Sequence, residues 1–294
     1  MKCPICNSNI IGITFHGKIR NGGLGIYTDD EQTMYKCEDC GAIWHKNTQD
    51  LVAYYESEEY RDSMGEGTDE QVFYQKHDRE TLEKLNYTGT DIFRDKTVAD
   101  IGCGPGAFLD FVAGAARDVI GVEPTDDYRT DLKRKGYFAY PYAIEAKRDW
   151  FGKVDVITSF DVIEHVEDPQ AFIQDAFDLN ADGGVSIIGT PTEAPFMREI
   201  VGKDFEQRQL FSVQHLWVFS EKSLILMAKR AGFTSIECRF YQRYGVANML
   251  GWVREKKPKS EISSPYVTAT LDQVWRGQMV DQKLADYIVL YAVK

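Results

Sequence analysis

The sequence predicts an α/β protein whose main sheet is mostly parallel and is preceded by a small cysteine-rich module. Short runs of buried-type residues at 98–101, 118–122 and 154–160 alternate with helical patterns, which predicts the sheet. A glycine-rich turn follows the first of these runs, as in many α/β folds. Two C-x-x-C pairs within the first 40 residues predict the module.

Charge and hydropathy limit the classes of function. The net charge of −12 disfavours non-specific nucleic-acid binding, which depends on neutralising phosphates. Residues 50–95 carry 13 acidic and 5 basic side chains, whereas residues 198–260 carry 12 basic and 6 acidic ones. This basic excess could receive a phosphorylated or nucleotide-linked small molecule, or it could simply face water. Because the chain has neither an apolar run of about 18 residues nor a signal-peptide pattern, we expect a cytoplasmic protein without membrane attachment.

The cysteine pairs define the first predicted domain, residues 1–46. Each pair can supply two thiolates from one tight turn, and 30 residues separate the two pairs. A hairpin of residues 10–16 and 32–36 would fill this spacer. Two such pairs complete a tetrahedral zinc site with no open position, so we expect about one structural zinc per chain. The expected ligands are Cys3, Cys6, Cys37 and Cys40, and the expected fold of the module is a small zinc ribbon. The alternative is a pair of reduced, metal-free turns.

Residues 47–96 are expected to form a helical linker or lid before the first strand of the main sheet. Tyr54, Tyr55 and Tyr60 fall in this segment and could line a substrate pocket, although ordinary packing would explain them equally well.

The turn after the first strand carries the strongest indication of function. Asp100 lies near the end of the strand, and Gly102, Gly104 and Gly106 open the turn into a helix from residue 107. Glycine permits a positive φ and a close approach of the backbone to a ligand. The spacing differs from the G-x-G-x-x-G dinucleotide fingerprint. A second carboxylate, Glu123, ends the next strand 17 positions beyond Gly106, where it could accept hydrogen bonds from both ribose hydroxyls of a nucleotide.

The pattern D-x-G-x-G-x-G followed by Glu123 resembles the first two motifs of the class I S-adenosylmethionine-dependent methyltransferases. The resemblance implies a Rossmann-like, seven-stranded methyltransferase sheet with an antiparallel last strand, in a domain of residues 97–294 with an insertion at about 243–285. It also implies S-adenosylmethionine as the cofactor. The implied contacts are Asp100, Gly102, Cys103, Gly104, Gly106, Glu123, Phe160 and Asp161.

Two histidines are candidate catalytic bases. His165 follows the strand that ends at Phe160, in a segment E-H-x-x-D-P that resembles one shared by many of these enzymes, where the histidine often orders the turn. His215 has a placement similar to E-H-x-x-x-x-S in zinc-bearing sugar C-methyltransferases, but Gln214 stands where the glutamate would be. A histidine is suited to removing a proton near neutral pH.

The predicted function is methyl transfer to a small hydroxylated acceptor. The segment N-x-L-x-W at 248–252, before a basic stretch, resembles methyltransferases of saccharide and natural-product pathways, so we expect O-methylation of a sugar or nucleotide-linked sugar. The alternatives are a sugar C-methyltransferase, a ribosomal RNA methyltransferase, and a regulatory protein that binds the cofactor without catalysis.

Overall fold

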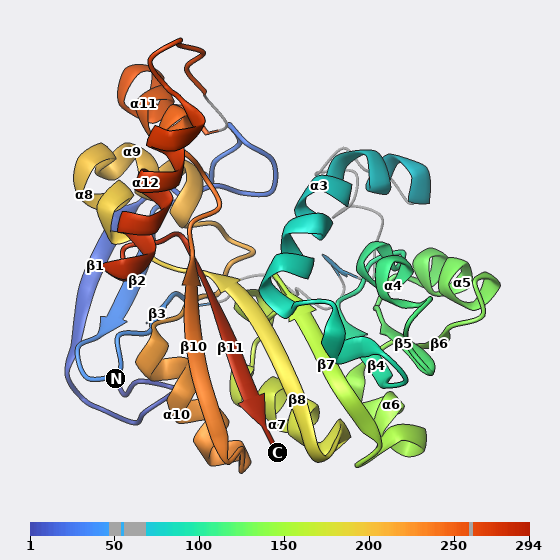
Figure 1. Ribbon diagram of the computed structural model, residues 1–294. Helices are drawn as coiled ribbons and strands as arrows, with labels where there is room; N and C mark the ends of the chain where they lie inside the picture. The colour runs from blue at the N-terminus through green and yellow to red at the C-terminus, as the bar shows by residue number, and fades with distance from the viewer. Residues whose placement is uncertain (47–53, 56–68, 259–260) are drawn as a thin grey trace. The chain divides into compact units, whose positions relative to one another are not determined.

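The computed structural model describes residues 1–46, 54–55, 69–258 and 261–294 (Figure 1). Its contacts divide the chain into two compact units. Unit 1 consists of Met1–Asn47, Thr190–Leu226 and Cys238–Val289, and unit 2 of Thr48–Gly189, Met227–Glu237 and Leu290–Lys294. Tyr60 and most of the predicted linker before residue 69 lie outside the described residues. No helix of the part described is long and apolar enough to cross a membrane.

The main sheet has seven strands in the order β10-β11-β8-β7-β4-β5-β6. The central strand β4 is buried along its whole length, as expected for a parallel strand covered on both faces. It pairs in parallel with β5 and β7, and β6 and β8 extend the parallel part on either side. The bounds are Thr97–Ile101 for β4, Asp118–Val122 for β5, Phe138–Tyr140 for β6, Val154–Phe160 for β7, Asn180–Pro191 for β8, Ser235–Tyr241 for β10 and Tyr287–Val293 for β11.

The strand β11 runs against its neighbour β8. The N–H of Gly183, near the start of β8, donates to the carbonyl of Lys294 at the chain end, and the Lys294 N–H donates to the Gly184 carbonyl. The start of one strand therefore meets the end of the other. This confirms the predicted mixed seven-stranded sheet with a reversed last strand.

Helices alternate with the strands of unit 2, and acidic side chains cap two of them. Asp69 accepts the N–H of Gln71 at the start of α3, and Asp168 accepts the N–H of Ala171 at the start of α7, where Pro169 occupies the first helical position. The helical segments are α3 (Glu70–Thr88), η1 (Asp91–Phe93), α4 (Ala107–Val112), α5 (Asp126–Arg134), α6 (Ala143–Trp150), η2 (Ile163–His165) and α7 (Pro169–Leu179).

Unit 1 contains a second sheet, in which the predicted hairpin gains a strand from far along the chain. The order is β1-β2-β3-β9, with β1 at Ile11–Gly17, β2 at Gln32–Cys37, β3 at Ile43–Trp44 and β9 at Trp217–Val218. Ile43 pairs with Val218 and Trp44 with Trp217 in antiparallel register. The predicted module of residues 1–46 is thus part of a larger compact unit.

The remaining elements of unit 1 are helices, and the predicted insertion supplies two of them. These are α11 (Val246–Glu255) and α12 (Ala269–Asp281), while α8 (Pro195–Val201), α9 (Lys203–Phe205) and the helical turn η3 (Glu206–Leu210) follow β8. The helix α10 (Glu221–Ala231) follows β9 and passes from unit 1 into unit 2.

Candidate functional site

The glycine turn of unit 2 adopts the backbone that its sequence predicts. Gly102, Gly104 and Gly106 have φ values of +78°, +56° and +95°, which side chains rarely tolerate. A Cβ at Gly102 would also lie 2.3 Å from Val162 Cγ2, and one at Gly106 would lie 2.7 Å from Leu132 Cδ2. Conformation and packing therefore both require glycine here.

Glu123 is held against this turn at the carboxyl end of β5. Its side chain is buried, and Oε2 accepts the Gly104 N–H at 2.9 Å while Oε1 accepts the Thr125 N–H at 3.0 Å. A carboxylate has about four lone-pair sites, so it can accept several hydrogen bonds at once. The neighbouring Thr125 Oγ1 is buried and has no hydrogen-bond partner among the described residues. An orphaned hydroxyl beside a carboxylate fits a ligand that brings its own hydroxyl groups.

Asp100 is a buried carboxyl group at the end of β4. Burial raises its pKa to about 7, and the negative charge of Glu123 adds to this shift. The hydrogen bond that Thr158 Oγ1 donates at 2.7 Å and the positive charge of Lys84 act in the opposite direction. Asp100 is therefore able to change its charge near neutral pH.

Phe160 is the last residue of the strand β7, and Asp161 follows it directly. Phe160 is buried against Phe108, with ring centroids 5.6 Å apart. Asp161 has a φ of +59°, and its Oδ2 lies 3.9 Å from Lys84 Nζ, which also lies 5.5 Å from the centre of the Phe160 ring. We did not predict Lys84, because its position on α3 gives no local indication that it reaches the end of β7.

Cys103 and His165 also belong to unit 2. Burial raises the pKa of the Cys103 thiol well above its usual value, and its Sγ contacts the Gly104 carbonyl at 3.4 Å, so this thiol is a packing group of the turn. His165 Nδ1 lies 2.7 Å from the Tyr55 hydroxyl, and His165 Nε2 lies 3.9 Å from the buried carboxylate of Glu164. This arrangement fixes the orientation of the imidazole ring.

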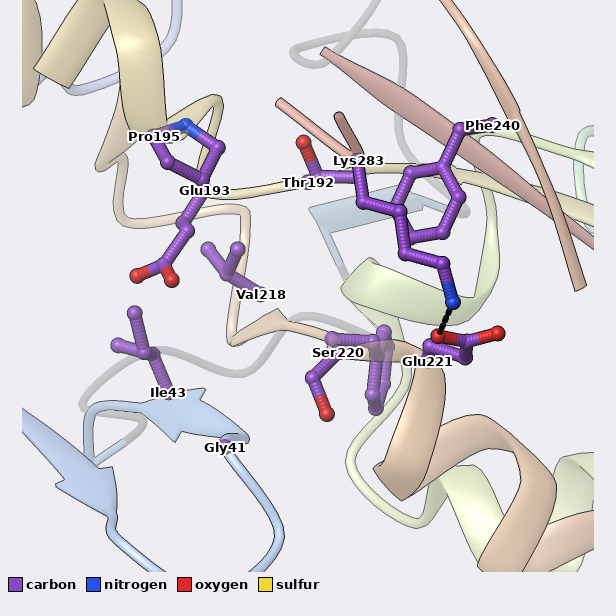
Figure 2. A pocket seen from close by; sticks show the side chains of 11 residues that line it. Gly41, Ile43, Thr192, Glu193, Pro195, Val218, Ser220, Glu221, Phe240 and Lys283 are labelled. Carbon is purple, nitrogen blue, oxygen red and sulfur yellow. Dashed lines mark hydrogen bonds and ion pairs between the residues drawn. The ribbon is translucent and has the colours of Figure 1, made fainter. Parts of the chain in front are cut away.

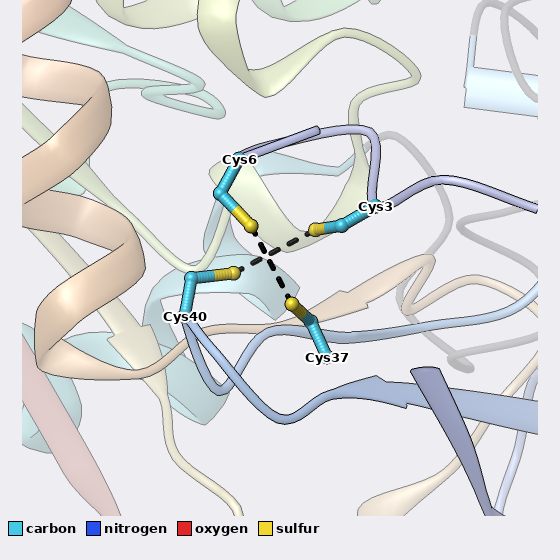
Figure 3. Close-up of side chains that lie close together, drawn as sticks. All are labelled: Cys3, Cys6, Cys37 and Cys40. Atoms are coloured by element: carbon cyan, nitrogen blue, oxygen red, sulfur yellow. Dashed lines mark hydrogen bonds between the residues drawn. The ribbon is translucent and has the colours of Figure 1, made fainter. Parts of the chain in front are cut away.

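The four cysteines of the first module lie together in unit 1 (Figure 3). The Sγ atoms of Cys3 and Cys40 are 3.6 Å apart and those of Cys6 and Cys37 are 3.4 Å apart, with all four within 4.8 Å of one another. Tetrahedral zinc with bonds of about 2.3 Å would place its sulfur ligands about 3.8 Å apart, so the cluster fits such an ion.

The local environment sets the ionisation of these thiols. Burial raises the pKa of the Cys3 thiol. At Cys37 burial acts in the same direction, but hydrogen bonds from the backbone of Cys40 and Asp39 and from the Cys6 thiol lower the pKa to about 7.

Two of the pockets formed by the described residues lie in unit 1. One lies beside the second cysteine pair, between Gly41, Ile43 and Ser220, with the paired side chains of Glu221 and Lys283 at its edge (Figure 2). The other is a pocket lined by His215, which we call the His215 pocket. Its apolar wall includes Met197, Phe205, Leu210, Trp252 and Trp275, and its polar groups include His215, Gln242, Arg243, Asn248 and Asp286.

Hydrogen bonds hold several of the polar groups of the His215 pocket. Asp286 accepts hydrogen bonds from the backbone N–H of Arg243 at 2.9 Å and from Gln242 Nε2 at 3.0 Å. Burial raises the pKa of Asp286, although the charge of Arg243 and the hydrogen bonds from the backbone of Arg243 and Tyr244 oppose the shift. The backbone N–H of His215 donates to Ser212 Oγ at 3.1 Å. Of the two predicted histidines, His215 belongs to unit 1 and His165 to unit 2.

A family model described as a methyltransferase domain matches residues 73–237. The chain belongs to this family. The prediction of an S-adenosylmethionine-dependent methyltransferase is therefore confirmed, and S-adenosylmethionine is the cofactor that the family uses. The match does not extend to residues 1–46, which carry the four cysteines.

Curated relatives cover part of the chain. A protein of Psychrobacter arcticus named ubiquinone biosynthesis O-methyltransferase is 29% identical over 152 residues, which is 47% of this chain and 59% of the relative. One of the same name from Ruegeria pomeroyi is 25% identical over 189 residues, with 61% and 74% covered. The chain thus spans less than two thirds of the length of the first of these relatives.

Solved structures share the fold. An S-adenosylmethionine-dependent methyltransferase from Archaeoglobus fulgidus is 17% identical with a TM-score of 0.52, covering 77% of this chain and all of the other. Another from Thermotoga maritima is 18% identical with a TM-score of 0.50, covering 76% and 93%. At these identities the likeness extends to the fold alone.

Proposed function

We propose that this methyltransferase transfers the methyl group of S-adenosylmethionine to an oxygen atom of a small hydroxylated acceptor. The observation that carries the proposal is the Glu123 carboxylate, fixed against the glycine turn beside the orphaned Thr125 hydroxyl. The names of the curated relatives support oxygen as the acceptor atom.

Residues of unit 2 would hold the cofactor. Glu123 and Thr125 would bind the ribose hydroxyls, because both present oxygen atoms at the end of β5. Asp100 and Lys84 would receive the ammonium and carboxylate groups of the amino-acid moiety, since they offer charges of opposite sign at the ends of β4 and β7. Cys103, Phe160 and Asp161 would shape the site around these groups.

The cofactor supplies an electrophilic methyl group on a sulfonium ion. Methyl transfer forms a bond from the acceptor oxygen to this carbon and breaks the carbon–sulfur bond, whose electron pair stays on sulfur. The acceptor hydroxyl must also lose its proton, and a positioned base assists this loss. The enzyme would act mainly by holding the oxygen and the methyl carbon in line and by excluding water.

His215 is the base that we propose, with His165 as the second candidate. Support for His215 comes from its place in a pocket with aromatic walls, which suit the flat face of a sugar or of an aromatic ring. His165 already contacts the Tyr55 hydroxyl through Nδ1, which favours an orienting role.

We propose a sugar or a nucleotide-linked sugar as the acceptor. The sequence favours a sugar or nucleotide-linked sugar, and a phosphate on such a molecule would suit the basic excess of residues 198–260. The relatives are named for ubiquinone biosynthesis, which gives no support to the sugar and makes other hydroxylated acceptors the first alternative. The acidic net charge of the chain disfavours ribosomal RNA.

We also propose that the four cysteines hold one structural zinc ion and that the protein works in the cytoplasm. Four thiolate ligands leave no position for a substrate, so the ion would contribute stability. The short distances between the sulfur atoms support the zinc site, and a reducing compartment would keep such thiols free to bind metal.

Calorimetry with S-adenosylhomocysteine tests the cofactor assignment, and saturable binding is the expected result. Turnover of S-adenosylmethionine with pools of nucleotide sugars, of phenolic compounds and of stripped ribosomes then tests the acceptor. Methylation on carbon would support the sugar C-methyltransferase alternative. Binding without turnover on any pool would contradict catalysis and support a regulatory protein.

A further inference from the structure

We propose that the metal held by the four cysteines builds the wall of the His215 pocket and leaves the cofactor site unaffected. The metal would thereby control binding of the acceptor without touching it. This inference rests on the proposals that the cysteines bind zinc and that the His215 pocket receives the acceptor. All the contacts that carry it lie within unit 1.

The cysteine module and the wall of the pocket share one hydrophobic core. Phe15, Ile19, Met34 and Ile43 of the module pack in a single cluster with residues that follow β8. Five members of this cluster, Ala194, Met197, Phe205, Leu210 and Trp252, also line the His215 pocket. The core of the module is therefore the layer directly behind the pocket wall. Loosening the module would remove packing partners from that wall.

The second cysteine pair leads directly to this shared layer. Cys40 is followed by Gly41, whose φ of +75° turns the chain into β3. The strand β3 then pairs with β9, and Ser220 Oγ donates a hydrogen bond to the Cys40 carbonyl. A Cβ at Gly41 would lie only 3.0 Å from Ser220 Cβ, so the two segments fit closely (Figure 2). A metal ion that fixes Cys37 and Cys40 would fix the partner strand of β9 as well.

A second connection reaches the residue next to His215. The buried side chain of Gln214 accepts the Gly22 N–H at 2.9 Å and donates to Asn21 Oδ1 at 3.1 Å. The backbone of Arg20 exchanges hydrogen bonds with the neighbouring segment, from its N–H to the Phe211 carbonyl and from the Val213 N–H to its own carbonyl. The loop between β1 and β2 thus holds the segment that carries His215. Gln214, which departs from the glutamate of the resembling enzymes, acts as a positioning residue here.

We expect the metal to supply much of the stability of the cysteine module. Four isolated thiols gain nothing from being brought together, whereas metal binding commonly supplies most of the folding free energy of a small four-cysteine module. Two-residue strands such as β3 and β9 make few hydrogen bonds of their own. Strands this short stay paired only when contacts with the rest of the protein hold both of them in place. Removal of the metal should therefore free residues 210–218 together with the module.

The test compares amide hydrogen exchange in the full chain with metal bound, after chelation, and after addition of Zn²⁺. We expect exchange in peptides spanning 210–218 to become at least about tenfold faster on chelation and to recover with Zn²⁺. Peptides spanning β5 of unit 2 should keep their protection, and affinity for S-adenosylhomocysteine should change less than about twofold. Unchanged protection of 210–218 after chelation, or absence of bound metal, would overturn the inference, as would equal loss of protection in β5.

A variant that keeps the cysteines tests the second connection. Gln214→Ala should retain its metal and its affinity for S-adenosylhomocysteine while exchange in 210–218 becomes faster. Gln273→Ala, on the exposed side of α12, is the matched control and should behave as the wild type. Unchanged exchange in Gln214→Ala would show that the loop does not hold this segment. If the wild type itself fails to bind S-adenosylhomocysteine, the proposed function fails, but the exchange data still decide this inference.

Discussion

The carboxylate of Glu123 holds the backbone of Gly104, with Oε2 2.9 Å from the glycine nitrogen. The two residues come from neighbouring strand ends, and Glu123 also binds the Thr125 N–H. Hydrogen bonds to a charged group contribute roughly 1.5–3 kcal/mol each. One side chain therefore links the glycine turn to the residue that precedes α5.

Replacement of Glu123 should weaken cofactor binding strongly. For Glu123→Ala we expect about a 10- to 100-fold loss of affinity for S-adenosylhomocysteine in calorimetry, because ribose contacts and the fixed turn are lost together. Asp182→Ala, which changes an exposed residue near the start of β8 in the same unit, should bind as the wild type does. A folded Glu123→Ala protein with unchanged affinity would contradict the ribose role.

Asp100 should make stability depend on pH. Its pKa of about 7 in the folded protein lies above the usual 3.8, so between these values the folded state keeps a proton that the unfolded state has lost. The free energy of unfolding therefore falls as pH rises through this window and levels off above about pH 7. The Asp100→Asn variant has no carboxyl group that titrates at this position, so it lacks this pH dependence. In urea unfolding, the free energy of unfolding of the variant minus that of the wild type should be about 2–3 kcal/mol larger at pH 8 than at pH 5. An equal difference at both pH values would contradict the raised pKa.

The parts of the site that contiguous sequence encodes could be predicted. A strand, a glycine turn and a helix follow one another from 97 to 112, so the positions of Asp100 and Gly102 relative to the turn are local. The next strand of a parallel sheet brings Glu123 to the same edge, and the cysteine spacing brings four thiols together. The family and the sheet are confirmed, whereas the roles of individual residues stay predictions.

Contacts between distant segments could not be predicted. The strand β9 has only two residues and pairs with β3 more than 170 positions earlier, which no periodicity in 217–218 indicates. Lys84 approaches Asp161, and Tyr55 approaches His165, only because helical segments before the first strand pack onto the sheet ends. Such contacts depend on tertiary packing, and the local conformational propensity of the sequence does not predict them.

His215 should act on turnover and leave cofactor binding intact. With an acceptor found by the pooled assay, His215→Ala should lower kcat by about 100-fold or more, since a positioned base contributes about 10²–10⁴-fold. His16→Ala, an exposed histidine of β1, is the control and should keep wild-type turnover. Normal turnover in His215→Ala together with a large loss in His165→Ala would assign the base to His165.

The cysteine cluster should hold about one zinc ion per chain. Elemental analysis of protein purified without chelator should give this ratio, because the sulfur distances fit tetrahedral coordination. Cys6→Ser should lose most of the metal, whereas Cys238→Ser, which changes a thiol outside the cluster, should keep it. Wild-type protein without metal would contradict the zinc site.

Thr125 allows ligand binding to be separated from stability. It precedes α5, but its hydroxyl makes no capping bond and is buried without a partner among the described residues. Thr125→Val should therefore leave stability unchanged or raise it slightly, because it removes an unsatisfied polar atom and keeps the shape of the side chain. If the hydroxyl binds the cofactor, affinity for S-adenosylhomocysteine should fall about 5- to 10-fold, the loss of roughly one hydrogen bond. Thr130→Val, whose hydroxyl donates to the Asp126 carbonyl on the exposed side of α5, is the control and should not affect affinity. Reduced stability with unchanged affinity in Thr125→Val would mean that the hydroxyl serves the fold and that the ribose contact must be sought elsewhere.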